Sequence, residues 1–98
     1  DLDGLRDRAR TLAARFVAAG IDAVAVDAEA RVGGGGAPER PLPSAAVALP
    51  ASFAEPLRRG KPPVVGYVED DRTLLNLRSV PPAADEALAG AVLECART

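Results

Sequence analysis

The chain has 98 residues, 12 basic and 14 acidic residues, a formal net charge of −2, and no His, Met or Trp. This length suits one domain with one core, and the missing histidine excludes Ser-His-Asp and Cys-His catalysis and the common His-bearing metal sites. The single cysteine excludes an internal disulfide, no apolar run approaches the roughly 18 residues of a membrane span, and the near-neutral charge argues against strong independent RNA binding.

The first 20 residues have the spacing of an amphipathic helix. Leu2, Leu5, Leu12 and Phe16 fall on one helical face, and Gly20 is a suitable stop. No residue at the start is a convincing N-cap, and the chain begins with Asp and has no Met. We therefore expect a piece cut from a longer protein, in which this apolar stripe is a docking element as well as part of the core.

Two strands are expected next, separated by a long connection. Residues 21–32 alternate, with Val24 on the apolar parity and Asp27 on the mixed one, which predicts a strand with one apolar face. Residues 33–43 hold four consecutive glycines and several prolines, a composition that we expect neither a helix nor a regular strand to tolerate. Residues 44–49 predict a short apolar strand.

Residues 52–59 predict a helix of about two turns. Ser52 and Glu55 have the spacing of a capping box, and Gly60 fits the position just after a helix end.

The last third of the chain predicts a hairpin and a helix. Residues 64–68 and 72–80 read as antiparallel strands around an acidic turn, in which Asp70 and Asp71 must adopt a left-handed conformation that glycine adopts more readily. The final helix is expected to have Asp85 and Glu86 in its first turn and an apolar stripe of Ala84, Leu88, Ala91, Val92 and Cys95.

The expected order is helix, strand, strand, helix, strand, strand, helix. Hairpin-paired strands with three helices to cover them predict an α+β fold, a two-layer sandwich of about four mostly antiparallel strands. The order of the strands in the sheet stays open.

The glycine run is the most visible candidate for binding. Gly33, Gly34, Gly35 and Gly36 could present backbone N–H groups to an anion, and Arg40 could pair with a carboxylate or phosphate. The alternatives are a plain connection and a solvated arginine, because neither the Lys-Ser/Thr of a P-loop nor a helix follows directly.

The other chemically capable residues have simpler interpretations. Lys61, the one lysine, could form an imine but reads as a surface residue, and Cys95 reads as a small buried hydrophobe. Arg72 and Arg78 could line a groove or be solvated, and Asp70 with its neighbours lacks the ligand count of a cation site. We predict no catalytic residue and no metal site in this chain.

Two blocks of sequence resemble a known family. Residues 60–88 read GKPPVVGYVEDDRTLLNLRSVPPAADEAL, with a Gly-x-Pro-Pro opening, a hairpin and a Leu-x-Leu-Arg-Ser-Val segment. Residues 32–35, Val-Gly-Gly-Gly, lead to Leu-Pro-Ser at 42–44. Both blocks resemble the C-terminal end of bacterial L-seryl-tRNA(Sec) selenium transferases. The chain departs from the family pattern at Gly36, Ala45 and Asp71, where Ser, an aromatic and Gly are usual.

The resemblance implies a parent enzyme of fold type I that uses pyridoxal phosphate (PLP). Such enzymes exchange the seryl hydroxyl of seryl-tRNA(Sec) for selenium from selenophosphate, and their cofactor lysine lies in a large domain. This chain would be the small C-terminal domain, spanning residues 1–98, non-catalytic and without cofactor when alone. Its partners would be the large domain, seryl-tRNA(Sec) and selenophosphate.

The resemblance also implies a homo-oligomeric parent in the cytoplasm, without membrane contact. The candidates for approaching the cofactor cleft of that parent would be the loop residues Gly33, Gly34, Gly35, Gly36 and Arg40. The alternative is an autonomous α+β binding module with no enzymatic parent. A long reading frame upstream of Asp1 would distinguish the two.

Overall fold

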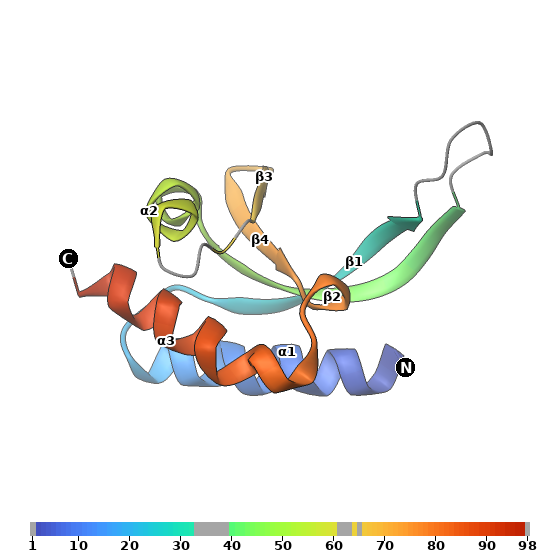
Figure 1. The fold of residues 1–98 in the computed structure, drawn as a ribbon, viewed down its shortest axis with the longest axis horizontal. Coiled ribbons are helices and arrows are strands. Elements are labelled where there is room, and N and C mark those ends of the chain that lie inside the picture. The colour runs from blue at the N-terminus through green and yellow to red at the C-terminus, as the bar shows by residue number, and fades with distance from the viewer. Residues whose placement is uncertain (1, 33–39, 61–63, 65, 98) are drawn as a thin grey trace.

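The computed structural model describes residues 2–32, 40–60, 64 and 66–97, and it extends 43 × 27 × 27 Å (Figure 1). The helices and strands are α1 Leu2–Ala18, β1 Val24–Val32, β2 Arg40–Pro50, α2 Ala54–Arg59, β3 Tyr67–Glu69, β4 Arg72–Asn76 and α3 Asp85–Ala96. Short 3-10 turns precede α2, follow β4 and precede α3. This order confirms the expected α-β-β-α-β-β-α arrangement. None of the described helices is long and apolar enough to cross a membrane.

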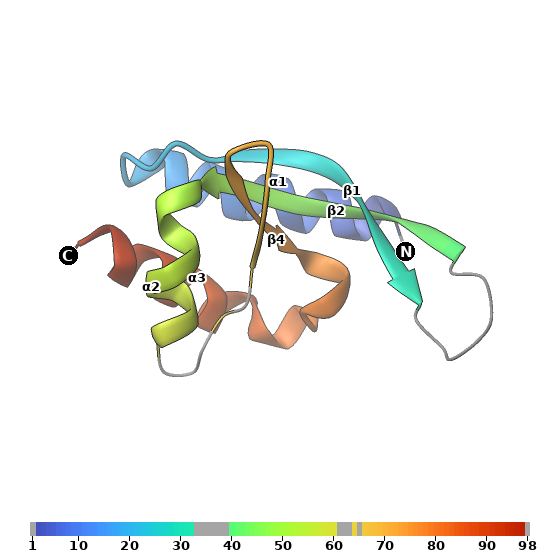
Figure 2. The same cartoon turned by 90° about the horizontal axis from the view of Figure 1, so that it is seen from above.

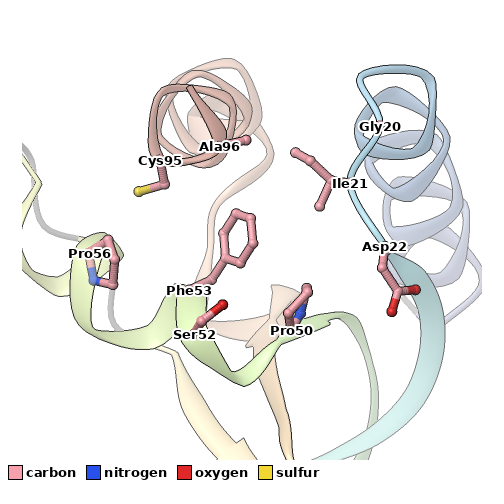
Figure 3. A pocket seen from close by; sticks show the side chains of 9 residues that line it. All are labelled: Gly20, Ile21, Asp22, Pro50, Ser52, Phe53, Pro56, Cys95 and Ala96. Atoms are coloured by element: carbon pink, nitrogen blue, oxygen red, sulfur yellow. The ribbon is translucent and has the colours of Figure 1, made fainter. Parts of the chain in front are cut away.

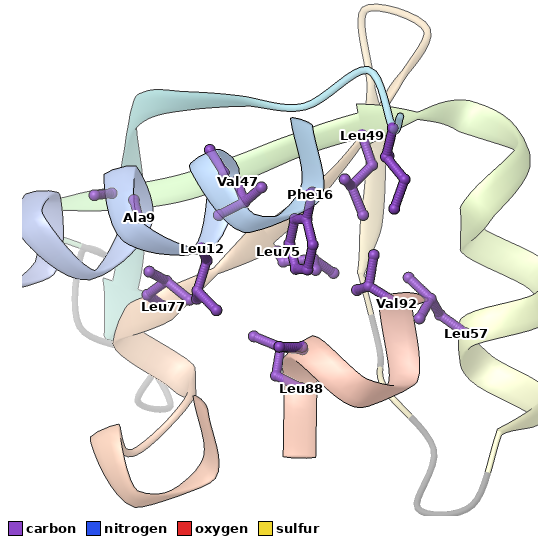
Figure 4. Packing of buried hydrophobic residues seen from close by; sticks show 14 of the residues in the cluster. Ala9, Leu12, Phe16, Val47, Leu49, Leu57, Leu75, Leu77, Leu88 and Val92 are labelled. Carbon is purple, nitrogen blue, oxygen red and sulfur yellow. The ribbon is translucent and has the colours of Figure 1, made fainter. Parts of the chain in front are cut away.

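The four strands form one antiparallel sheet in the order β1-β2-β4-β3. Helices α1 and α3 lie together against one face of it (Figure 1), and the two-layer α+β fold is therefore confirmed. The main core fills the space between these layers, where Phe16 of α1, Val47 of β2 and Val92 of α3 are fully buried (Figure 4).

Helix α1 follows its sequence pattern closely. Leu5, Leu12 and Phe16 are buried in the domain's own core, while Val17 is 56% exposed. Gly20 has a φ of +87°, a conformation that suits glycine at a helix end. The expected docking role is wrong for Leu5 and Phe16, because the sheet already covers them; Leu2 is only partly buried.

Strand β1 turns its mixed side, and not its apolar side, toward the main core. Its mixed parity faces α1: Ala25 packs against the main core, and Asp27 accepts a hydrogen bond from Arg6 of α1 at 3.1 Å. Its apolar parity, with Val26 and Ala28, packs with strand residues alone on the other face of the sheet.

Strand β2 begins earlier than we expected, which corrects the prediction that residues 40–43 could not be a regular strand. Pro41 lies opposite Arg31, and Pro43 lies opposite Glu29. Because β4 pairs with β2 only from Ala46 onward, the first half of β2 has one neighbour and tolerates residues that lack an N–H.

The predicted capping box of α2 is wrong. Ser52 lies in a 3-10 turn, Phe53 occupies the N-cap without a side-chain hydrogen bond, and Glu55 pairs instead with Arg58 and Arg59. The helix does end before Gly60, but this glycine is extended, at φ −69° and ψ 171°, rather than left-handed.

The hairpin is shorter than predicted on both arms. The first strand is confined to Tyr67–Glu69, and the second ends at Asn76, whose side chain accepts a hydrogen bond from the backbone N–H of Arg78 and starts a 3-10 turn. Asp70 and Asp71 have φ values of +52° and +62°, which confirms the left-handed turn.

We expect Asp71→Gly to stabilise the chain by about 0.5–1 kcal/mol, because glycine adopts positive φ without a steric cost. Asp71→Ala keeps the Cβ atom and is the control, with no gain expected. Urea unfolding followed by circular dichroism measures both differences, and a loss of stability in the glycine variant would contradict the prediction.

Helix α3 is joined to α1 by a half-buried ion pair. Arg8 donates to both carboxylate oxygens of Asp85, at 2.6 and 3.0 Å, and to the carbonyl of Val80 at 2.7 Å. The Arg8 and Asp85 side chains are only 17% and 26% exposed. Leu88 and Val92 are buried as expected, and Ala91 and Cys95 are partly buried.

Arg8→Met is expected to cost about 2 kcal/mol, because it leaves Asp85 and a carbonyl without their charged donor. Arg10→Met is the matched control. Arg10 pairs with Asp7 in an exposed position, with side chains 65% and 74% exposed, so we expect a loss below about 0.5 kcal/mol. Equal unfolding midpoints for the two variants would show that the buried pair contributes nothing beyond a surface pair.

Candidate functional site

Most of the residues proposed from sequence for binding lie outside the described residues. Gly33, Gly34, Gly35, Gly36 and Lys61 are all in this group. The backbone of Arg40 is described and pairs with Val32 at the start of β2. Asp70 and Asp71 are exposed in their turn, and among the described residues no group of His, Cys, Asp or Glu could hold a metal ion.

A groove of about 540 Å³ lies between the end of α3, the segment before β1 and the start of α2 (Figure 3). Phe53 and Ile21 line it with Cys95 and Asp22. Desolvation, and secondarily the charge of Glu94, raises the pKa of the Cys95 thiol, so the thiol stays protonated at neutral pH and is a poor nucleophile. Asp22 is already paired with Arg72 at 2.9 Å. This groove therefore has little reactive chemistry.

A second, smaller cleft of about 290 Å³ lies between α1 and the first two strands. Arg6 and Asp27, which line it, are bonded to each other at 3.1 Å. These two opposite charges therefore pair with each other within the fold.

A polar cluster brings together the two sequence blocks that carry the family resemblance. We call Pro43, Ser44, Asn76 and Arg78 the Arg78 cluster. The Ser44 hydroxyl lies 2.6 Å from Asn76 Oδ1, and the Arg78 guanidinium donates to the Pro43 carbonyl at 2.5 Å. Asn76 Nδ2 also donates to the carbonyl of Glu29, opposite Pro43, at 3.0 Å. Residues more than 30 positions apart thus meet where β4 ends beside β2.

Arg78 is the chemically distinctive member of this cluster. Seven other described arginines form ion pairs with carboxylates: Arg6, Arg8, Arg10, Arg15, Arg58, Arg59 and Arg72. Arg78 is exposed and has no described carboxylate within ion-pair distance. A guanidinium that a carbonyl holds in place, without an acidic partner, can bind an incoming phosphate or carboxylate.

Only part of this arrangement can be predicted from the sequence. The sequence predicts that Arg78 either lines a groove or is solvated, and its β2 partners Pro43 and Ser44 belong to the Leu-Pro-Ser segment of the family resemblance. Pro43 is the sequence signal that could have indicated this contact. Proline has no N–H, so the carbonyl of the residue opposite it in the sheet needs a hydrogen-bond donor from elsewhere. That requirement points to a nearby polar side chain but does not name Asn76.

Comparison with known proteins agrees with the resemblance. Residues 1–81 match the family model described as L-seryl-tRNA selenium transferase. The L-seryl-tRNA(Sec) selenium transferase of Hyphomonas neptunium is 35% identical over 86 residues, covering 81% of this chain and 19% of the relative. The chain thus spans about a fifth of the length of that relative. Because the family model covers most of the 98 residues, this chain belongs to the L-seryl-tRNA selenium transferase family.

Proposed function

We propose that this chain is the small C-terminal domain of a PLP-dependent enzyme that converts seryl-tRNA(Sec) to selenocysteinyl-tRNA(Sec) with selenophosphate. The observation that carries the proposal is the Arg78 cluster, in which the two family-like blocks meet within the matched residues 1–81. The proposal includes a homo-oligomeric parent in the cytoplasm, with the large domain as the direct partner of this chain.

The described residues do not fit a PLP site. PLP needs a lysine amine for its imine, and the described residues contain no lysine. We therefore propose that the cofactor lysine belongs to another part of the parent enzyme and that the chain alone is inactive. Mixing PLP with the chain should give no imine absorbance; a band that Lys61→Ala removes would contradict this.

Within the enzyme, we assign Arg78 the role of an anion ligand. The hydrogen bond to the Pro43 carbonyl holds the guanidinium in place. No described carboxylate pairs with it, so a phosphate or carboxylate of the substrates can do so. The cluster's remaining bonds hold Asn76 and Ser44 in place, which keeps the 3-10 turn that carries Arg78 next to β2.

A chimera tests the proposal. The matched region of the Hyphomonas neptunium relative is replaced by this chain, and transfer of radioactive selenium to tRNA(Sec) is measured. We expect the chimera to be active and the same relative without the region to be inactive. A folded but inactive chimera would contradict the proposed function, and so would a natural protein that contains these residues alone and binds an unrelated partner.

Arg78→Ala in the chimera is expected to lower selenium transfer at least tenfold, and Arg78→Lys to restore part of it. Arg97→Ala is the matched control, because Arg97 is also exposed and has no described ion pair but lies outside the matched residues 1–81. Equal activities of the two alanine variants would contradict a role for Arg78.

A further inference from the structure

The turn that carries Arg78 is held from two sides. We call residues 77–80 the Arg78 turn; it lies between the end of β4 and the start of α3 (Figure 2). On one side, the backbone N–H of Arg78 donates to Asn76 Oδ1 at 3.1 Å. On the other, the Arg8 guanidinium of α1 donates to the first and last carbonyls of the turn, at 3.4 and 2.7 Å. The backbone around Arg78 is therefore fixed by contacts with two other parts of the fold.

The Arg78 turn combines a buried anchor with an exposed cation. Leu77 is fully buried in the main core (Figure 4), while Arg78 is exposed. One N–H of the Arg78 guanidinium is used by the Pro43 carbonyl, and a guanidinium has four more to donate to a ligand. A side chain that is already held in place loses less conformational entropy on binding than a freely moving one. The turn thus presents one positioned cation at the protein surface.

Two substrates of the proposed function, selenophosphate and seryl-tRNA(Sec), could supply a phosphate to this cation. Small ligands usually bind in concave sites that bury most of their surface. Among the described residues, Arg78 is the one unpaired cation of this turn, since the nearby Arg8 is paired with Asp85. Nucleic acids are bound differently, because exposed arginines each contact one backbone phosphate and the affinity is the sum of many such contacts. A lone exposed arginine therefore suits a nucleic-acid phosphate better than selenophosphate.

We propose that Arg78 binds one phosphodiester group of the tRNA substrate, an inference that rests on the proposed function. The guanidinium donates to the phosphate oxygens through the N–H groups that Pro43 leaves free. The chain has a net charge of −2, so this contact adds to binding by the parent enzyme and gives the chain alone no strong affinity for RNA. A phosphate contact positions a nucleic acid without reading its bases, so Arg78 orients the tRNA and does not select its sequence.

The salt dependence of tRNA binding by the full-length natural protein tests the inference. Arg78→Gln removes the charge and Arg78→Lys keeps it. Arg97→Gln is the matched control, because Arg97 is also exposed and has no described ion pair. The Kd for unacylated tRNA(Sec) is measured by filter binding from about 50 to 200 mM salt, a range over which phosphate contacts weaken strongly. The KM for selenophosphate is measured separately, and circular dichroism checks that each variant unfolds at the same midpoint.

We expect Arg78→Gln to raise the Kd for tRNA(Sec) about tenfold at low salt and to reduce the slope of log Kd against log salt by about 1, the loss of one phosphate contact. Arg78→Lys is expected to keep the slope, because an ammonium still neutralises one phosphate. Arg97→Gln should behave as the natural protein does. An unchanged slope in Arg78→Gln would overturn the proposal. A raised KM for selenophosphate with normal tRNA binding would also overturn it and would assign Arg78 to the smaller substrate.

The measurements separate this inference from the proposed function. If the natural protein transfers selenium but Arg78→Gln binds tRNA(Sec) as well as Arg97→Gln does, the inference fails and the function stands. If the natural protein transfers no selenium, the proposed function fails, but the salt slopes still decide the Arg78 contact because binding is measured without selenophosphate. A protein that neither transfers selenium nor binds tRNA(Sec) would overturn both.

Discussion

Phe16→Ala is expected to remove about 3–5 kcal/mol of stability, a large part of the roughly 5–10 kcal/mol expected for a domain of this size. The ring of this α1 residue is fully buried between the sheet and α3 (Figure 4), so its truncation is expected to leave a cavity that the core refills only in part. We therefore expect the variant to be partly unfolded at 37 °C.

Val17→Ala is the control for this variant. Val17 is the next residue of the same helix but is 56% exposed, so its truncation is expected to cost less than about 0.5 kcal/mol. Urea unfolding measures both. A difference below about 1 kcal/mol between the two variants would show that α1 does not pack as described.

Leu75→Ala and Leu77→Ala are each expected to cost about 2–5 kcal/mol. Leu75 is 2% exposed on the helix-facing side of β4, and Leu77 is fully buried although the strand has already ended. The turn that Asn76 begins re-aims the chain, so that both leucines reach the core.

Val68→Ala is the matched control on the neighbouring strand, because Val68 is 57% exposed. Its expected cost is below about 0.5 kcal/mol. A loss below about 0.5 kcal/mol at both Leu75 and Leu77 would contradict the end of β4 and the turn that follows it.

Local patterns predicted the features that depend on near neighbours. The apolar stripe on α1 predicted which of its residues are buried, and Gly20 predicted where the helix ends. The short acidic turn predicted positive φ at Asp70 and Asp71. The capping box failed because Ser52 and Glu55 satisfy only a spacing rule, while the 3-10 turn that precedes α2 shifts the helix start to Ala54.

The sequence predicted the segments that form the candidate site but not their contact. The Leu-Pro-Ser and Leu-Arg-Ser-Val segments were recognisable, but their contact depends on the β2–β4 register, which places Ala46 opposite Asn76. The register depends on pairing between strands that are far apart in the sequence. The distance from Pro43 to Arg78 therefore cannot be predicted from either segment alone.

The amino-acid sequence by itself determined the element order, the α+β class and the family, because periodicity, turn residues and matching segments are all written along the chain. Only the tertiary structure decided which side of each strand is covered. Alternation shows that Val24 and Val26 share one face of β1 and that Asp27 lies on the other. Which face packs on α1 depends on the sheet register and on the position of the helices. As a result, the apolar side of β1 packs with the other strands on the face of the sheet away from the main core.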